Sequence, residues 1–319
     1  MHYDIIGDIH GQPGKLVTLL TTLGYEKIQG VWRHSERKAL FVGDYIDRGP
    51  GQLEVLRIVR AMVDAGTAVA IMGNHEFNAI AWHTRDPLTL NEHLRRHTDK
   101  NRHQHAAFLA EVEGTPEHDT WINWFKTLPL WWEDAHVRAI HACWHPEHMA
   151  TLRPLLGPGN TLTEELIEAS SRKGSSAYVA VEDLLKGLEV DLPAGCVYRD
   201  ADGHERSRTR VRWWDMEART YRRGAMVPPA SQDQLPDTPL PPEACVNYDG
   251  AKPLFFGHYW FTGQPQVLNP HMCCVDFSAA KAGHPLVAYR YHGEKQLDPR
   301  HLLAAWHGAP LKASRLRVR

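Results

Sequence analysis

The sequence predicts an α/β protein whose main sheet is at least partly parallel. Residues 3–7, 39–43 and 68–73 form short apolar runs typical of buried strands. Two stretches between these runs carry apolar residues at positions i, i+3, i+4 and i+7, the spacing of one helix face: Leu16, Leu19, Leu20 and Leu23, then Val55, Ile58, Val59 and Met62. Strands that alternate with helices favour parallel pairing, because each helix returns the chain to the same end of the sheet.

The rest of the chain adds helices and strands and one segment of different character. Helical spacing continues downstream at residues 103–113, 116–128, 163–172 and 179–188. Strand patterns return at residues 137–141, 253–257, 272–275 and 286–291. Residues 197–214 alternate around a turn signal at Asp202 and Gly203, which predicts a hairpin. Residues 228–242 hold six prolines, which predicts an extended loop.

Composition narrows the class of protein. The chain has 319 residues, enough for one large domain with an insertion or for a core plus a small second domain. A net charge of -2 gives no sign of a surface for nucleic acid or an anionic membrane. No apolar run approaches the ~18–20 residues of a membrane span. The five cysteines form no CxxC pair, which favours reduced thiols over disulfides or a zinc–cysteine site. We therefore expect a cytoplasmic protein that contacts neither membrane nor nucleic acid.

Three polar motifs follow the first three predicted strands. They are GDIHG at residues 7–11, GDYIDRG at residues 43–49 and GNHE at residues 73–76. Functional groups in an open α/β sheet gather beyond the carboxyl ends of the strands, so these motifs are expected to share one crevice. Each motif alone is common, but three at successive strand ends predict a functional site. The side chains that they supply are Asp8, His10, Asp44, Asp47, Arg48, Asn74 and His75.

Together the motifs resemble the signature of the calcineurin-like metallophosphoesterase superfamily. The branch that they resemble includes phosphoprotein phosphatases and diadenosine-tetraphosphate hydrolases. The resemblance is specific over residues 1–80, looser at 121–145 and 253–292, and absent from 146–250. It implies a β-sandwich of two mixed sheets flanked by helices, with an inserted α+β segment. We therefore expect a catalytic core at 1–145 and 251–300, an insertion at 146–250 that shapes specificity, and a C-terminal tail at 301–319.

The resemblance also implies two divalent metal ions and two further ligand histidines, each following a strand. His141 and His258 fit, because both follow short apolar runs. Each could instead be a hydrogen-bonded core histidine, and His145 is an alternative to His141. The implied ligands mix oxygen and nitrogen without thiolates, which suits manganese first, or iron or zinc. The six implied ligands are Asp8, His10, Asp44, Asn74, His141 and His258, and Asp44 is implied to bridge the two ions.

The mechanism implied by the resemblance is attack on phosphorus by a hydroxide that bridges the two metals. In it His75 protonates the leaving oxygen as general acid, and Asp47 holds His75 in orientation. Arg48 clamps the phosphate oxygens, although Asp47 and Arg48 could instead form a plain salt bridge. A second phosphate-binding arginine is implied between the two late histidines. The candidates are Arg208, Arg210 and Arg212; we expect Arg212, with a solvated basic strand face as the alternative.

The expected function is metal-dependent hydrolysis of phosphate esters. Phosphomonoesters or phosphoproteins are the leading substrates, and dinucleoside polyphosphates, hydrolysed by a bis(5'-nucleosyl)-tetraphosphatase, are the alternative. Partners are therefore a phosphorylated small molecule, a nucleotide or a phosphoprotein. A non-catalytic binding protein on the same fold is a further alternative, but it need not retain all seven polar motif residues. Aromatic side chains beside the late histidines could stack a nucleobase or pack in the core; they are Trp144, Tyr259, Trp260 and Phe261.

Overall fold

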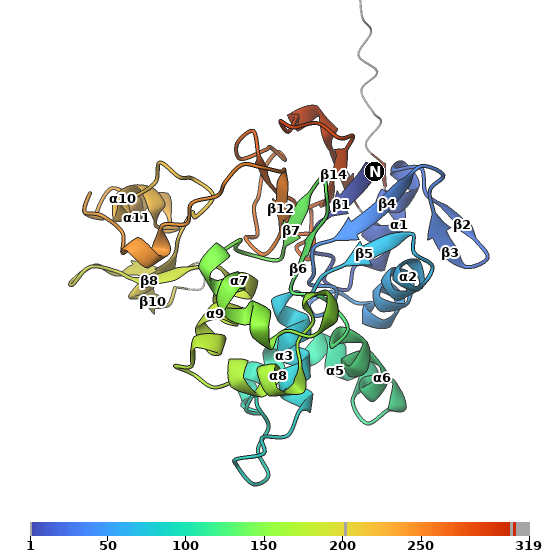
Figure 1. Ribbon diagram of the computed structural model, residues 1–319, viewed down its shortest axis with the longest axis horizontal. Coiled ribbons are helices and arrows are strands. Elements are labelled where there is room, and N and C mark those ends of the chain that lie inside the picture. The colour runs from blue at the N-terminus through green and yellow to red at the C-terminus, as the bar shows by residue number, and fades with distance from the viewer. Residues whose placement is uncertain (1, 201–202, 307–308, 311–319) are drawn as a thin grey trace, which may run out of the picture.

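Two mixed β-sheets packed face to face form the centre of the computed structural model, which describes residues 2–200, 203–306 and 309–310 (Figure 1). The larger sheet has the strand order β16-β15-β14-β1-β4-β5 and the smaller has β13-β12-β7-β6. β1, β4 and β5 pair in parallel, as do β7, β12 and β13, whereas the remaining neighbours are antiparallel. The predicted α/β sandwich of two mixed sheets is therefore confirmed.

Apart from the hairpin expected at 197–214, every strand expected from the sequence is present in one of these sheets. The larger sheet contains β1 (His2–Ile6), β4 (Arg37–Phe41), β5 (Ala68–Ala70), β14 (Leu286–Tyr291), β15 (Leu302–Trp306) and β16 (Ala309–Pro310). The smaller contains β6 (Trp131–Glu133), β7 (Arg138–Ile140), β12 (Leu254–Phe256) and β13 (Met272–Cys274). A separate hairpin pairs β2 (Glu26–Ile28) with β3 (Val31–Arg33).

Side chains on the two faces of these strands pack into two different apolar clusters. Ile5 and Leu40 point between the sheets and belong to the same apolar cluster as Phe255 of the smaller sheet. Ile6 and Phe41, one residue along, point the other way into the larger cluster that the helices cover. Successive strand side chains alternate between faces, so a strand buried on both sides reads as a continuous apolar run.

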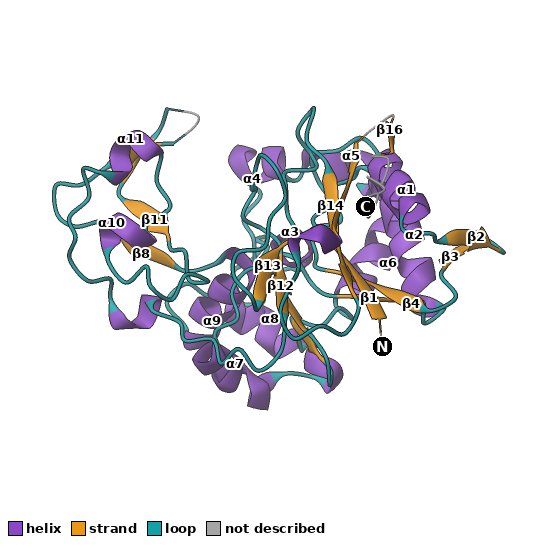
Figure 2. Cartoon of the chain, turned by 90° about the horizontal axis from the view of Figure 1, so that it is seen from above, coloured by secondary structure: helices purple, strands orange, loops and turns teal. Residues whose placement is uncertain are grey.

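Helices cover the outer faces of the sandwich (Figure 2). The segment before the insertion contains α1 (Pro13–Thr22), α2 (Gln52–Asp64), α3 (Asn74–His83), α4 (Asp99–Gln104), α5 (Ala106–Val112) and α6 (Pro116–Phe125). The sequence predicted a single helix at 103–113, but the structure has two helices there, α4 and α5. The division falls at His105, whose backbone leaves helical geometry (φ -111°, ψ 7°) while its ring is buried.

The predicted insertion contains two parts that pack differently. Its helices α7 (Pro146–Leu152), α8 (Glu164–Ser170) and α9 (Ser176–Lys186) contribute Leu152, Ile167 and Leu184 to the main apolar cluster. The second part lies at one end of the molecule in both views, with a small core of its own that includes Leu192 and Val227 (Figures 1 and 2). Its elements are β8 (Glu189–Asp191), β9 (Tyr198–Arg199), β10 (Glu205–Arg206), β11 (Arg208–Arg210), α10 (Tyr221–Gly224) and α11 (Pro229–Gln232).

Two expectations about these later segments need correction. The predicted hairpin at 197–214 is limited to β9 and β10, because β11 pairs with β8 instead. The predicted tail at 301–319 is not a tail at its start, because β15 pairs along β14 and extends the larger sheet. The basic residues at 312–319 lie outside the described residues. No helix in the described part of the chain is long and apolar enough to cross a membrane.

Candidate metal centre and active site

The six residues expected as metal ligands converge at neighbouring strand ends of the two sheets. Asp8 and His10 follow β1, Asp44 follows β4, and Asn74 begins α3 immediately after β5. His141 follows β7 and His258 follows β12 in the smaller sheet. All six side chains are buried. The sandwich thus brings together side chains that lie up to 250 positions apart in the sequence.

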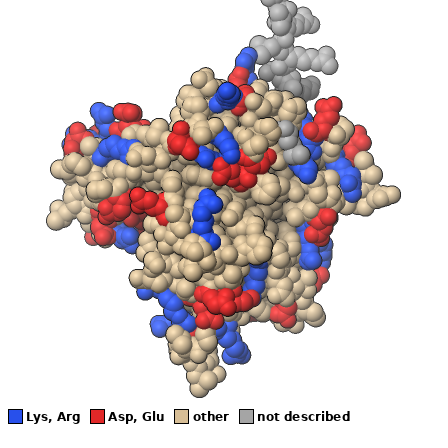
Figure 3. All heavy atoms as spheres, in the orientation of Figure 1, with Lys and Arg blue, Asp and Glu red and all other residues tan. Residues whose placement is uncertain are grey.

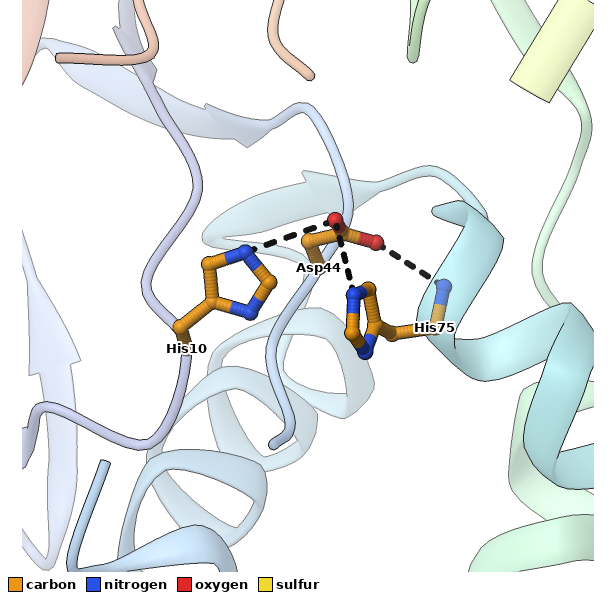
Figure 4. A group of neighbouring side chains, drawn as sticks. All are labelled: His10, Asp44 and His75. Carbon is orange, nitrogen blue, oxygen red and sulfur yellow. Dashed lines mark hydrogen bonds and ion pairs between the residues drawn. The ribbon is translucent and has the colours of Figure 1, made fainter. Parts of the chain in front are cut away.

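Asp44 lies at the middle of this cluster. Its Oδ2 is 3.5 Å from His10 Nε2, and its Oδ1 is 3.4 Å from His141 Nε2. Figure 4 shows the side of the carboxylate that faces His10 and His75. Two groups of ligand atoms, each within 4.8 Å of one another, share Asp44: one adds His10 and His75, the other His141 and His258. One carboxylate therefore lies between two candidate cation positions.

Unpaired buried atoms show that these residues fit divalent cations. Asp8 Oδ1, His10 Nε2 and His258 Nε2 are buried and have no hydrogen-bond partner. Buried polar atoms are almost always paired, and leaving one unpaired costs about 1–3 kcal/mol. His10 Nδ1 is 2.8 Å from the Ile46 carbonyl, so Nδ1 carries the proton and Nε2 directs its lone pair inward. Burial also lowers the pKa of His10 to about 3, which keeps the ring neutral and able to bind a metal.

Tight backbone geometry shapes this site. His10, Asp44 and His258 adopt positive φ angles of 46°, 53° and 71°, which non-glycine residues rarely do. Such strain costs about 1–3 kcal/mol per residue and persists where the surroundings impose it. Gly257 is required next to His258, because a Cβ there would lie 2.0 Å from Asp8 Oδ1. The surroundings therefore hold these loops in strained conformations that bring the proposed ligands together.

Glu76, the last residue of GNHE, ties two of these loops together although we expected no role for it. Its Oε2 accepts hydrogen bonds from the backbone N–H groups of Asp44 (2.9 Å) and Gly73 (3.0 Å). Its Oε1 accepts one from the Tyr45 N–H (2.9 Å). Burial, together with the charge of Asp44, raises the pKa of Glu76 to about 7. Glu76 thus fixes the position of Asp44 relative to α3.

Asp276 is a second buried carboxylate that the sequence reasoning missed. It accepts hydrogen bonds from the N–H groups of Trp260 (2.7 Å) and Ser278 (2.9 Å), and so holds the loop after His258. Burial raises the pKa of Asp276, and both burial and the charge of Asp276 raise the pKa of Asp8. Asp276 follows β13 as Asp8 follows β1, so its place after an apolar run was a usable signal.

His75 is oriented by Asp47, and Asp47 by a second histidine. His75 Nδ1 lies 2.6 Å from Asp47 Oδ2, while Nε2 points toward the centre, 3.9 Å from Asp44 Oδ2 (Figure 4). His105 Nδ1 lies 3.0 Å from both oxygens of Asp47. Burial alone would raise the pKa of Asp47, but these two imidazoles hold it below its ordinary value. Nothing in its local sequence singles out His105.

Arg48 does not form the alternative salt bridge with Asp47. Its guanidinium carbon lies 3.8 Å from the centre of the Trp260 ring, in a cation–π contact. Among the described residues the ion pairs of Asp47 are with His75 and His105 only. Arg48 lines a cavity of about 800 Å³ that also contains Asp44, His75 and His258.

Arg210, and not the expected Arg212, lines the active-site cavity. Arg210 lines the same cavity as Asn74 and His258, whereas Arg212 lines a separate surface hollow with Asp215. β11 ends at Arg210, and the Arg212 N–H bonds the Gly224 carbonyl (2.8 Å) in the following turn. Residues two apart share a face only within a strand, so the alternation that relates Arg208 to Arg210 does not extend to Arg212.

His145 and most of the neighbouring aromatic residues face away from the centre. His145 stacks on His148 with ring centres 3.9 Å apart, and Trp144 is buried in the main core. Tyr259 is also in the core, where its hydroxyl accepts a hydrogen bond from Trp213 Nε1 (2.8 Å). Of the four aromatic residues considered for base stacking, only Trp260 lines the cavity.

A sandwich of two mixed sheets, with carboxylate and imidazole side chains gathered at neighbouring strand ends, is consistent with the metallophosphoesterase fold. A family model described as calcineurin-like phosphoesterase matches residues 1–192. The chain belongs to this family, whose members are phosphate ester hydrolases.

Curated relatives match shorter parts of the chain. It is 49% identical over 76 residues to the asymmetrical bis(5'-nucleosyl)-tetraphosphatase PrpE of Halalkalibacterium halodurans, covering 24% of this chain and 31% of that protein. It is 31% identical over 137 residues to the symmetrical bis(5'-nucleosyl)-tetraphosphatase of Aromatoleum aromaticum, covering 43% of this chain and 42% of that protein. The chain thus spans less than half the length of these relatives.

A solved structure matches over nearly the whole chain. A protein serine/threonine phosphatase from Saccharomyces cerevisiae superposes with a TM-score of 0.50 at 12% identity, covering 96% of this chain and 80% of that one. At this identity the likeness concerns the fold alone.

Proposed function

We propose that this protein hydrolyses phosphate esters with two divalent metal ions held by the residues around Asp44. The observation that carries the proposal is a buried carboxylate between two ligand groups, surrounded by unpaired buried nitrogen and oxygen atoms. When bound, two such ions supply an acidified water as nucleophile and neutralise the charge of the phosphoryl oxygens. The proposed ligands are Asp8, His10, Asp44, Asn74, His141 and His258. Their mixed donors favour manganese, with iron or zinc as alternatives.

Residues of the chain supply the other parts of the reaction. Asp47 holds His75 through Nδ1, which leaves Nε2 facing the cavity to donate a proton to the leaving oxygen. Arg48 and Arg210 line this cavity and present planar forks of N–H donors that suit phosphoryl oxygens. The general acid and the phosphate-binding cations are thus available in one cavity with the proposed metal ligands.

Single phosphomonoesters and phosphoproteins remain the leading substrates from the sequence, but the cavity supports dinucleoside polyphosphates as a second candidate. Five cationic side chains line it beside the carboxylates of Asp44, Asp47 and Glu189; they are Arg48, Arg95, Lys100, Lys186 and Arg210. The matched relatives are named as tetraphosphatases. Nucleic acid is not favoured, since Lys and Arg among the described residues are interspersed with Asp and Glu on the face drawn in Figure 3. The free cysteines support a cytoplasmic location.

Turnover assays on metal-loaded protein test the proposal. We expect hydrolysis of p-nitrophenyl phosphate with added manganese, loss of activity with a chelator, and recovery when manganese is restored. A panel with diadenosine tetraphosphate and a phosphopeptide then separates the two substrate candidates. Protein that contains two metal ions per chain but hydrolyses none of the three compounds would contradict the proposed function.

A further inference from the structure

The active-site cavity borders a second cavity of about 680 Å³. The second cavity lies among α3, α8, α9 and the loop at 84–98, which projects at the lower end of Figure 1. Four residues line both cavities and therefore form their junction: Asn78, Arg95, Asn101 and Lys186. A ligand that extends from the proposed metal centre toward α9 would reach this junction.

Arg95 is fixed at the junction by neutral partners. Its two terminal nitrogens donate to Asn78 Oδ1 (3.1 Å) and Gln104 Oε1 (2.9 Å). Among the described residues no ion pair includes Arg95, whereas Lys186 is paired with Glu182. Partial burial lowers the pKa of Arg95, although the nearby charge of Glu182 acts in the opposite direction. An arginine keeps its charge under these conditions, so a partly desolvated cation remains available to an anion.

Asn78 indicates how far this cation lies from the proposed metal ligands. It is four residues after Asn74 in α3, so the two side chains lie on the same helix face about 6 Å apart along the axis. Arg95 is hydrogen-bonded to Asn78 and therefore lies farther along α3 than the proposed metal ligand Asn74. Further phosphates of the same chain would reach it.

The loop that carries Arg95 is held in place before any ligand binds. Arg172 of the segment after α8 donates to both oxygens of Asp86, at 2.9 and 2.7 Å. The Arg95 N–H itself donates to the Ala81 carbonyl of α3 (2.9 Å). A preorganised cation loses little conformational entropy on binding, which favours recognition of a defined position.

We propose that Arg95 binds a second, distal phosphate of a polyphosphorylated substrate whose reacting phosphate lies at the metal centre. The inference rests on the proposed phosphoesterase function and deepens it by naming the substrate class, a chain of several phosphates. The group beyond that phosphate then occupies the second cavity.

Two substrates measured on three proteins test this role. The proteins are the metal-loaded wild type, Arg95→Met and the matched control Arg85→Met, which removes the same charge from the same loop outside both cavities. We expect Arg95→Met to lower kcat/KM for diadenosine tetraphosphate by about tenfold or more, because a hydrogen bond to a charged group is lost. Turnover of p-nitrophenyl phosphate, which has no distal phosphate, should fall by a much smaller factor in Arg95→Met and should be unchanged in Arg85→Met. A fourth protein, Arg95→Lys, keeps the charge and should lose less than Arg95→Met.

Inhibition by inorganic phosphates tests the same contact with compounds that have no nucleoside. Inorganic tripolyphosphate should inhibit p-nitrophenyl phosphate hydrolysis less well in Arg95→Met than in Arg85→Met, while inhibition by orthophosphate should be the same. Metal chelation by tripolyphosphate affects all three proteins alike and cancels in the comparison. Equal losses on both substrates, or no loss on either, would overturn the inference. Absence of any turnover in the metal-loaded wild type would instead count against the proposed function.

Discussion

Two residues of one short helix illustrate how position decides the chemistry of a histidine. His75 begins α3 and has Asp47 on one ring nitrogen and the proposed metal centre on the other side. His83 ends the same helix and pairs with Asp119 near the surface. A general acid needs one ring nitrogen held and the other facing the reaction centre, and of these two histidines only His75 has that arrangement toward the proposed metal centre.

Replacing His75 separates proton transfer from metal binding. We expect His75→Asn to lower kcat by about 10²–10⁴-fold, the range that a general acid contributes. Both metal ions should remain, because His75 is proposed as an acid and not as a ligand. Kinetics with elemental analysis of bound metal check this, and His83→Asn is the matched control. Full activity in His75→Asn would remove this residue from the mechanism, and loss of a metal ion would make it a ligand.

A pair of arginines tests the assignment at the end of β11. We expect Arg210→Met to lower kcat/KM for p-nitrophenyl phosphate by about tenfold or more, because its fork lines the active-site cavity. Arg212→Met removes the same charge two residues away and should change it by less than about twofold. Steady-state kinetics on both variants decide between them. A larger effect at Arg212 would restore the expectation from the sequence.

At the scale of elements, hydrogen bonds across loops hold the strand ends in register. Glu76 joins the start of α3 to the loop after β4 through three backbone N–H groups. Asp276 joins the loops after β12 and β13 in the same way. Both carboxylates accept from backbone donors that would otherwise be buried without partners.

The contribution of Glu76 can be measured as stability. Glu76→Gln keeps the size of the side chain but places an NH2 group against N–H donors. We expect the free energy of unfolding to fall by about 1–3 kcal/mol, the cost of unsatisfied buried groups. Chemical denaturation of metal-free protein measures this, and the exposed Glu54→Gln should stay within about 0.5 kcal/mol of wild type. Equal stability of the two variants would mean that the loops do not depend on Glu76.

Local sequence patterns were enough to predict some of these elements but not others. The strands and the faces of α1 and α2 were predictable, because periods of two and of 3.6 residues are local properties. The break between α4 and α5 was not, because it falls at His105, whose partner Asp47 lies 58 residues earlier in the chain. The end of β11 at Arg210 likewise depends on its pairing with β8.

Over the whole molecule, four buried carboxylates gather where the two sheets meet: Asp8, Asp44, Glu76 and Asp276. Burial and neighbouring carboxylates raise the pKa of Asp8, Glu76 and Asp276, so ionising all three is unfavourable without a counter-charge. Burial alone would raise the pKa of Asp44 as well, but that pKa is instead lowered, because His141, His75 and His10 surround its carboxylate. Divalent ions would supply that charge, which couples metal binding to the stability of the fold.

Removing the metal should therefore destabilise the protein. We expect a chelator to lower the melting temperature by on the order of 5 °C or more, and manganese to restore it, because a ligand that binds only the folded state stabilises it. Differential scanning calorimetry with and without chelator measures the shift. Asp44→Asn is the matched control, since it should show little dependence on chelator. An unchanged melting temperature after complete loss of metal would show that the cluster needs no counter-charge.

Local sequence alone determined the order of strands and helices, the three motifs and the residues that they contain. Strand ends and turns depend on short stretches of chain, so they could be predicted from these. The resemblance extended this to His141 and His258, and the structure places both at the cluster. Tertiary structure decided what depends on distant segments meeting. It placed Arg210 and not Arg212 in the cavity lining, brought His105 to Asp47 and Asp276 to the loop after β12, paired β15 with β14, and set Arg95 at the junction of two cavities. These contacts form only when both sheets and the insertion pack, so no local period encodes them.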